Sequence, residues 1–118
     1  MRRLAVVLLL TGCASAATTP PGPLSGVWAG TFAIGPSTGQ IEFWVVQRGG
    51  ELSGTAVASD GSGTVRGSVV GRVEGDAVTG RVATAGARSG NYEFSGTLRG
   101  DTLTGTLRGG TMEVRKVK

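Results

Sequence analysis

A short pattern, apolar–any–Gly–any–apolar, recurs along this chain and limits what the chain can fold into. Its copies are WAGTF (28–32), LSGTA (52–56), VVGRV (69–73), VTGRV (78–82), FSGTL (94–98) and LTGTL (103–107). Glycine normally weakens a strand, because it costs backbone entropy and has no side chain to pack. Side chains of a strand alternate between its two faces, so each glycine shares a face with its two apolar neighbours. The pattern therefore predicts strands whose buried face carries a glycine at its centre.

Beyond residue 25 the chain has no helical periodicity, and Gly, Thr and Val dominate. Turn signals recur at a spacing that is typical of an all-β barrel or sandwich. We predict eight strands, at 26–34, 40–47, 51–58, 64–73, 77–84, 91–99, 102–108 and 111–117.

Two-residue turns fix the register of three predicted hairpins. In one hairpin Gly71 faces Gly80, and in the next Gly96 faces Gly105. These inward glycines form a layer that relieves crowding and permits sharp coiling in a small closed sheet. We therefore predict an eight-stranded antiparallel up-and-down β-barrel, with an open two-sheet sandwich as the alternative. The three turns are Gly49-Gly50, Gly75-Asp76 and Gly100-Asp101.

The first residues, MRRLAVVLLLTGC (1–13), have the layout of a bacterial secretory signal: two arginines, an apolar run and small residues before a cysteine. The ending LTGC resembles the lipobox of bacterial lipoproteins, in which the thiol corresponding to Cys13 is acylated. The resemblance implies a signal peptide at 1–12 and a lipid on Cys13 that holds the chain at a membrane. In enteric-type lipoproteins, a residue such as Ala14 after the cysteine, in place of Asp, favours the outer membrane. An ordinary signal peptide with a chance cysteine is the alternative.

Residues 13–25 join this leader to the predicted strands. Three prolines in ASAATTPPGPLS (14–25) disfavour both helix and central strand, so we expect a semi-extended tether. The folded domain is then 26–118, anchored in the bacterial cell envelope and facing the periplasm or the surface.

The tripeptide GVW (26–28) at the start of the first strand resembles the Gly-x-Trp signature of calycins, the superfamily of lipocalin and avidin-like barrels. The resemblance implies that Trp28 closes one end of the barrel. It also implies that Trp28 stacks against a basic side chain of the last strand, here Lys116 or Arg115.

Charge and residue usage exclude several classes of function. The formal charge is +4, but the basic residues are spread along the chain, so there is no patch of the kind that binds nucleic acid. The chain has no histidine, and lipidation would consume its only cysteine, Cys13. The usual general base, a thiol nucleophile and the commonest metal ligands are therefore missing. We expect a protein that is not an enzyme and that has no cofactor and no metal.

The predicted connections are unequal, and this points to one end of the barrel as the binding end. Those at 35–39, 59–63 and 85–90 are longer than the two-residue turns at the other end, where the tether leaves. Loops on a rigid scaffold and the mouths of barrels are favoured ligand sites. We expect a small, mostly apolar ligand at this mouth, and the candidate ligand-binding residues are Phe32, Gln40, Asp60, Arg88, Asn91 and Tyr92.

An eight-stranded barrel either fills its interior with side chains or holds one small ligand, and the sequence leaves both open. A cavity above about 300 Å³ at the mouth favours ligand binding. A packed interior favours a structural or protein-interaction lipoprotein of the envelope. For such a partner protein, the outward-facing Trp44, Val46 and Val57 offer an apolar surface group.

Replacing Cys13 tests the proposed anchor, because the acyl group needs its thiol. We expect Cys13→Ser to accumulate as an unprocessed precursor that carries no label when cells are fed radioactive fatty acid. Normal incorporation of the label into this variant would rule out Cys13 as the lipidated residue.

Overall fold

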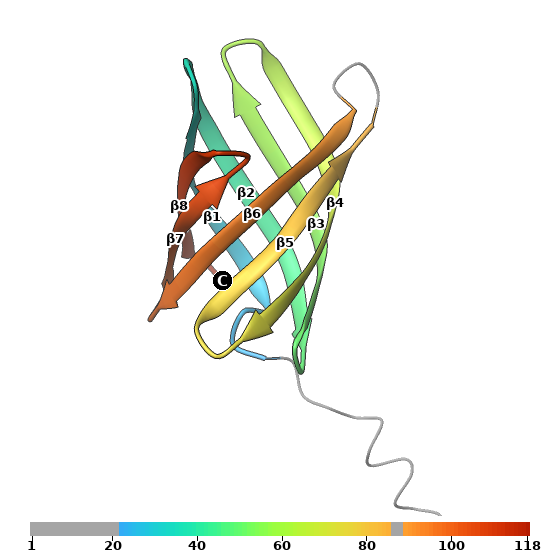
Figure 1. The fold of residues 1–118 in the computed structure, drawn as a ribbon, viewed down its shortest axis with the longest axis vertical. Coiled ribbons are helices and arrows are strands. Elements are labelled where there is room, and N and C mark those ends of the chain that lie inside the picture. Colours follow the sequence, from blue (N-terminus) through green and yellow to red (C-terminus); the bar gives the residue numbers. More distant parts are fainter. Residues whose placement is uncertain (1–21, 86–88) are drawn as a thin grey trace, which may run out of the picture.

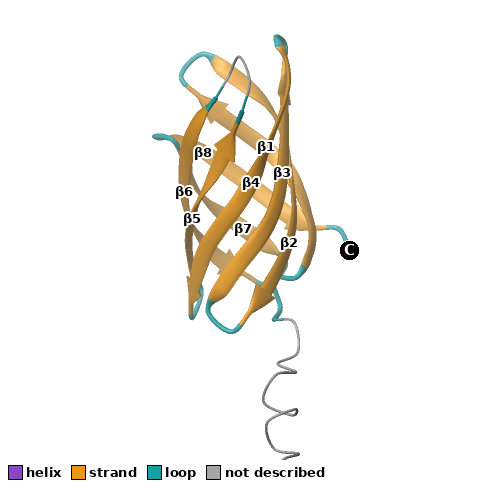
Figure 2. Ribbon diagram, turned by 90° about the vertical axis from the view of Figure 1, so that its right-hand side faces the viewer, coloured by secondary structure: helices purple, strands orange, loops and turns teal. Residues whose placement is uncertain are grey.

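The computed structural model of the chain describes residues 22–85 and 89–118. Its strands form a closed barrel in which each strand pairs with the next and the last pairs with the first (Figures 1 and 2). All pairs are antiparallel, so the predicted up-and-down barrel is confirmed and the sandwich alternative is wrong. The strands are β1 (Gly26–Ile34), β2 (Ser37–Arg48), β3 (Glu51–Asp60), β4 (Gly63–Glu74), β5 (Ala77–Thr84), β6 (Gly90–Arg99), β7 (Thr102–Leu107) and β8 (Gly110–Lys116).

The predicted signal peptide (1–12), Cys13 and residues 14–21 of the predicted tether lie outside the described residues. Within the described ranges, the structure has no helix with the length and apolar character needed to span a membrane. All eight strands and the core lie between residues 22 and 118, and every strand has a partner on both sides. Residues 14–118 therefore contain a complete folding unit.

The three predicted hairpin registers are confirmed. Gly71 pairs with Gly80, Gly96 pairs with Gly105, and Val45 pairs with Gly54. Each of the three turns begins with a glycine in the left-handed region, a conformation that glycine adopts without steric cost and that matches the twist of the flanking strands. These are Gly49, Gly75 and Gly100, with φ of 59°, 62° and 62°.

The inward glycines lie directly against the backbone of the neighbouring strand. A Cβ on Gly80 would stand 2.5 Å from the carbonyl oxygen of Val70 and 2.8 Å from Cζ of Phe94. A Cβ on Gly105 would overlap the carbonyl oxygen of Ser95. The space of the missing side chains is therefore occupied by adjacent strands and by Phe94, and this close approach lets the sheet coil and close.

Side chains fill the barrel at the end that carries the turns 49–50, 75–76 and 100–101, which we call the closed end. The void left among them measures about 20 Å³. The rings of Phe43 and Phe94 lie 5.6 Å apart and are tilted by 54°, an arrangement that aromatic pairs prefer. The inward residues here are Leu24, Trp28, Phe43, Val45, Leu52, Val78, Phe94, Leu103 and Val114.

Residues 22–25, which belong to the predicted tether, cover the closed end. Leu24 is buried there, and its backbone N–H donates to Oε1 of Gln47 over 3.0 Å. Its carbonyl accepts a hydrogen bond from Nε1 of Trp28 over 2.9 Å. The backbone N–H of Gly22 donates to the carbonyl of Gln47 over 2.8 Å. The described chain therefore enters the fold at the closed end.

Trp28 has its predicted place but not its predicted contact. Its side chain is 2% exposed, and it lies opposite Lys116 of β8. The Lys116 ammonium, however, donates to the carbonyl of Pro23 over 3.0 Å. Cation–π contacts within the described part of the chain involve Tyr92 and Trp44 instead. The covering segment has no strand partner for its carbonyls, so it attracts donors such as this ammonium.

Gly80 and its neighbour Thr79 provide a matched test of the glycine layer. Gly80→Val should destabilise residues 14–118 by about 1–3 kcal/mol, because the new side chain has no room inside. For a domain of this size that lowers the melting temperature by roughly 4–8 °C for each kcal/mol. Thr79 is exposed on the outer face, so Thr79→Val should change it little. Equal shifts in calorimetry for the two variants would contradict the register.

The two tryptophans should differ sharply in solvent access. In single-tryptophan variants, acrylamide should quench Trp44, which is 48% exposed, and should leave Trp28 protected. Trp28→Ala should also cost about 3–5 kcal/mol of stability, as truncations of large buried aromatics do. The opposite order of quenching would mean that β1 and β2 face the wrong way.

Candidate ligand-binding cavity

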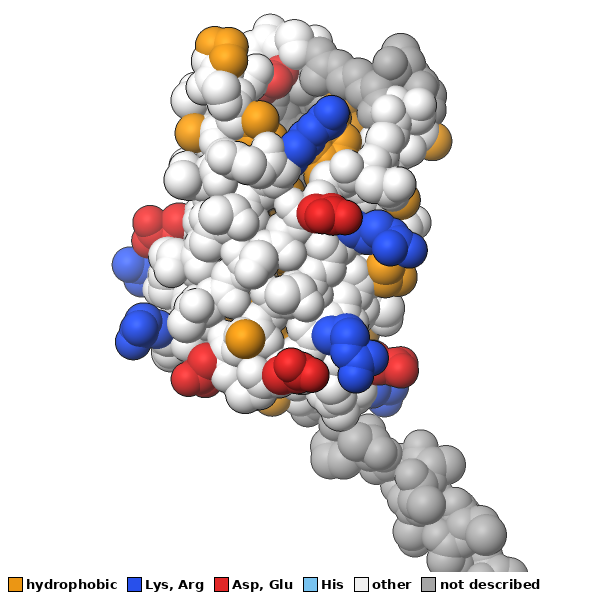
Figure 3. Space-filling view, viewed as in Figure 1, with side chains coloured by type: hydrophobic (Ala, Val, Ile, Leu, Met, Phe, Trp, Pro, Cys, Tyr) orange, Lys and Arg blue, Asp and Glu red, His pale blue; other side chains and the backbone are white. Residues whose placement is uncertain are grey.

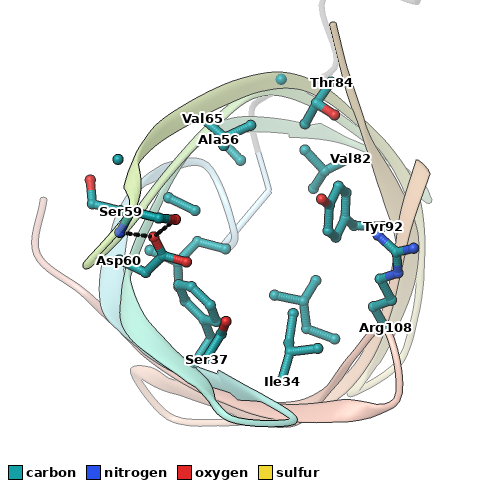
Figure 4. A pocket seen from close by; sticks show the side chains of 17 residues that line it. Ile34, Ser37, Ala56, Ser59, Asp60, Val65, Val82, Thr84, Tyr92 and Arg108 are labelled. Atoms are coloured by element: carbon teal, nitrogen blue, oxygen red, sulfur yellow. Dashed lines mark hydrogen bonds between the residues drawn. The ribbon is translucent and has the colours of Figure 1, made fainter. Parts of the chain in front are cut away.

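The other half of the barrel interior is hollow. A cavity of about 410 Å³ lies at the end with the connections 35–36, 61–62, 85–89 and 108–109, which we call the open end. The interior is thus neither wholly packed nor wholly hollow. Its lining residues are mostly apolar, with polar side chains among them near the opening, as Figure 4 shows from close by. The apolar ones are Phe32, Ile34, Ile41, Ala56, Ala58, Val65, Val82 and Leu107, and the polar ones are Ser37, Ser59, Asp60, Ser62, Thr84, Tyr92 and Arg108.

The cavity exists because the inward side chains of β3 become small toward the open end. Leu52 packs into the core near the closed end, whereas Ala56 and Ala58 line the cavity. Opposite Ala56 on β4 stands Gly67, which has no side chain. Larger side chains at Ala56 and Ala58 would fill this space, so the small inward residues of β3 leave room for the cavity.

Two of the three predicted longer loops are two-residue turns between longer strands, so these loop predictions are wrong. Ser37 pairs with Ile34, which leaves Gly35-Pro36 as the turn. Gly35 has a φ of 58°, and the fixed φ of proline suits the position after such a glycine.

The β3–β4 turn is closed by its own side chains. The Asp60 carboxylate accepts hydrogen bonds from the backbone N–H and the Oγ of Ser62, over 2.7 and 2.6 Å. This contact is of the kind by which aspartate stabilises turns. The connection after β5, at 85–89, is the one that remains longer, and its residues 86–88 are not described.

The rim of the open end is uneven. β2 and β4 have 12 residues each, whereas β7 has 6 and β8 has 7. In Figure 1 the β7–β8 turn therefore lies well below the β3–β4 hairpin. In the space-filling view of Figure 3, apolar atoms are visible inside the hollow of the upper end, with a basic side chain across it. The cavity is open to the side above the β7–β8 turn.

Arg108 in this low turn is a site residue that the sequence analysis missed. Its Cζ lies 4.7 Å from the centroid of the Tyr92 ring, and both residues line the cavity. The predicted strand 102–108 gave Arg108 an outward side chain. The strand ends one residue earlier, at Leu107, and Arg108-Gly109 forms the turn, with φ of 48° and 81°. The Arg-Gly dipeptide before the last strand was the available turn signal.

The structure brings three of the six candidate residues to the cavity, namely Phe32, Asp60 and Tyr92. Gln40 and Asn91 are exposed and do not line it, because strand alternation turns each outward beside an inward neighbour. Arg88 lies outside the described residues.

Two opposite charges face each other across the opening: Asp60 on one side and Arg108, beside Tyr92, on the other (Figure 4). Asp60 is engaged by Ser62, whereas Arg108 forms no ion pair with another residue of the described ranges. Those ranges also hold no cluster of three or more His, Cys, Asp or Glu residues suited to a metal ion.

No protein-family model matches the chain, and no curated protein and no solved structure is significantly similar to it. A function for this chain therefore has to be argued from its own sequence and from the geometry of the cavity.

Proposed function

We propose that this chain is a lipid-anchored binding protein of the bacterial cell envelope that holds a small, mostly apolar ligand in the open end of its barrel. The observation that carries the proposal is the cavity of about 410 Å³, apolar in its depth and open at one end. Ligand pockets typically measure about 300–1,000 Å³ and combine apolar walls with a few polar groups. This cavity lies within that range of volumes, and its walls are mostly apolar with a few polar groups.

The ionisable side chains of the cavity support binding more than catalysis. They are Asp60, Tyr92 and Arg108. The Asp60 carboxylate already accepts two hydrogen bonds within its own turn. Among the described residues no second carboxylate lines the cavity beside it, and paired carboxylates are what hydrolytic acid–base chemistry uses.

The position of the chain entry fits a membrane anchor. Gly22 lies at the closed end, bonded to Gln47. A lipid on Cys13 would hold that end toward the membrane, and the tether would leave the open end facing away from it. A ligand could then enter the cavity without passing through the lipid.

A neutral fluorescent probe tests the proposal. N-phenyl-1-naphthylamine should bind residues 14–118 with one site per chain and gain fluorescence as it enters the cavity. Ala58→Phe places a ring in the cavity and should weaken binding by about tenfold or more, which is about 1.4 kcal/mol, because the ring occupies space that the probe needs.

Val57→Phe is the matched control, because Val57 neighbours Ala58 on β3 and faces outward. This variant should bind the probe within about twofold of the original chain, since a change on the outer face leaves the cavity intact. Unchanged binding by Ala58→Phe, or no binding by the original chain, would overturn the proposal.

A second candidate function, that of a protein-interaction lipoprotein, is favoured by a separate observation. Of the predicted group, Trp44 and Val46 are 48% and 40% exposed on the outer face of β2, whereas Val57 is half-buried. Val70 on β4 is also exposed, at 48%. Such exposed apolar groups can mark a surface for a partner protein. If deletion of the gene has a cellular defect, Ala58→Phe should reproduce it under the first function and Trp44→Ser under the second.

A further inference from the structure

We propose that the ligand is a single-chain carboxylate whose head group is bound by Arg108 at the rim and whose hydrocarbon chain enters the cavity. This inference rests on the proposed function and names the chemical class of its ligand. Three features carry it: the backbone of Arg108, the surroundings of its guanidinium, and the size and polarity of the cavity.

The backbone of Arg108 is unusual for its residue type. Arg108 and Gly109 both have positive φ, 48° and 81°. A two-residue turn with two positive φ values strongly prefers Asn, Asp or Gly at its first position. Among the described residues other than glycine, Arg108 alone has a positive φ. Disfavoured backbone of this kind is concentrated at binding and catalytic sites, and the turn itself has no need of a guanidinium.

The guanidinium is held but not neutralised. Its Cζ lies over the Tyr92 ring, 4.7 Å from the ring centroid, and its N–H donors form no hydrogen bond to another residue of the described ranges. It forms no ion pair with another described residue, and the Tyr92 hydroxyl has no hydrogen bond to one. Figure 4 shows the Tyr92 ring inside the opening, next to Arg108. A planar guanidinium edge binds a carboxylate through two parallel hydrogen bonds.

Asp60 helps to determine on which side of the opening a charged head group binds. It lies across the opening from Arg108, so an anion is attracted to one side and repelled from the other (Figure 4). A cationic head group would need the Asp60 carboxylate, which the β3–β4 turn already uses. The Arg108 guanidinium is therefore placed to bind an anionic head group at the rim.

The cavity limits the rest of the ligand to one hydrocarbon chain. Its depth is lined by apolar residues such as Phe32, Ile41 and Val82. At about 30 Å³ for each methylene, close to the volume of a water in the liquid, 410 Å³ holds roughly ten to thirteen carbon atoms. A lipid with two long chains would exceed this volume.

Calorimetric titration of residues 14–118 with three ten-carbon probes tests the inference. Decanoate, decanol and decyltrimethylammonium share a chain and differ in charge. Decanoate should bind about tenfold or more tightly than decanol, because hydrogen bonds to charged groups are the strong ones, and the cation should bind worst. From hexanoate to decanoate the affinity should rise about fourfold for each methylene, and it should level off once the cavity is full.

Arg108→Asn is the decisive variant, because asparagine suits the left-handed turn and should not lower the melting temperature. The preference for decanoate over decanol should fall to about twofold or less, since the charged donor is lost. Arg108→Lys should keep part of that preference. Arg72→Gln removes a positive charge from the exposed outer face, and this control should keep the preference intact.

Each other outcome has a definite meaning. Equal binding of decanoate and decanol by the original chain, or the same loss of preference in Arg72→Gln and Arg108→Asn, would overturn this inference and leave the proposed function standing. Tighter binding of the cationic probe would assign the head group to Asp60. Binding of none of the three probes, nor of N-phenyl-1-naphthylamine, would overturn both proposals.

Discussion

The close approach of neighbouring strands at their inward glycines is the contact on which this barrel depends. Gly71 lies opposite Gly80 and Gly96 opposite Gly105, and a Cβ at these positions would meet the backbone or a core side chain of the adjacent strand. An eight-stranded sheet must coil strongly to close on itself. Glycine lowers the local preference for a strand, but at these positions it permits the curvature that closure needs. A closed sheet has no unpaired edge.

The size of the inward side chains differs along the barrel and divides its interior into two halves. Near the closed end, large residues including Trp28 and Phe94 fill the interior, with Phe94 against Gly80, and Leu24 covers them. Toward the open end, Ala56 lies opposite Gly67, and both line the cavity. The interior of an eight-stranded barrel is just wide enough to be filled by side chains or to hold one small ligand. Side chains fill the interior at the closed end, and the cavity occupies the open end.

Period-two alternation and glycine turns were enough to predict eight strands, the registers of three hairpins and the closed barrel from the sequence. They were not enough for the rim. Strand alternation predicts faces only when the strand end is known, and ending β7 at Leu107 instead of at 108 moved Arg108 from the outer face to the cavity. The same limit applied to Lys116, because its contact with the carbonyl of Pro23 depends on a segment without periodicity. Phe32 and Tyr92 were placed correctly, because they lie in predicted strands, where alternation sets the face. Asp60 also reaches the cavity, but as the last residue of β3 and not in the predicted loop.

Arg108 has a backbone conformation that the fold requires but that arginine does not favour. The other turns described with a positive φ place it on glycine, as unstrained hairpins require. In a chain so rich in glycine, a glycine or an asparagine at 108 would make the same turn with less backbone strain. Disagreements of this kind are expected where a residue is kept for binding and not for folding. The position of the guanidinium over the Tyr92 ring, at the edge of an apolar cavity, is the feature that the proposed binding of a carboxylate would use.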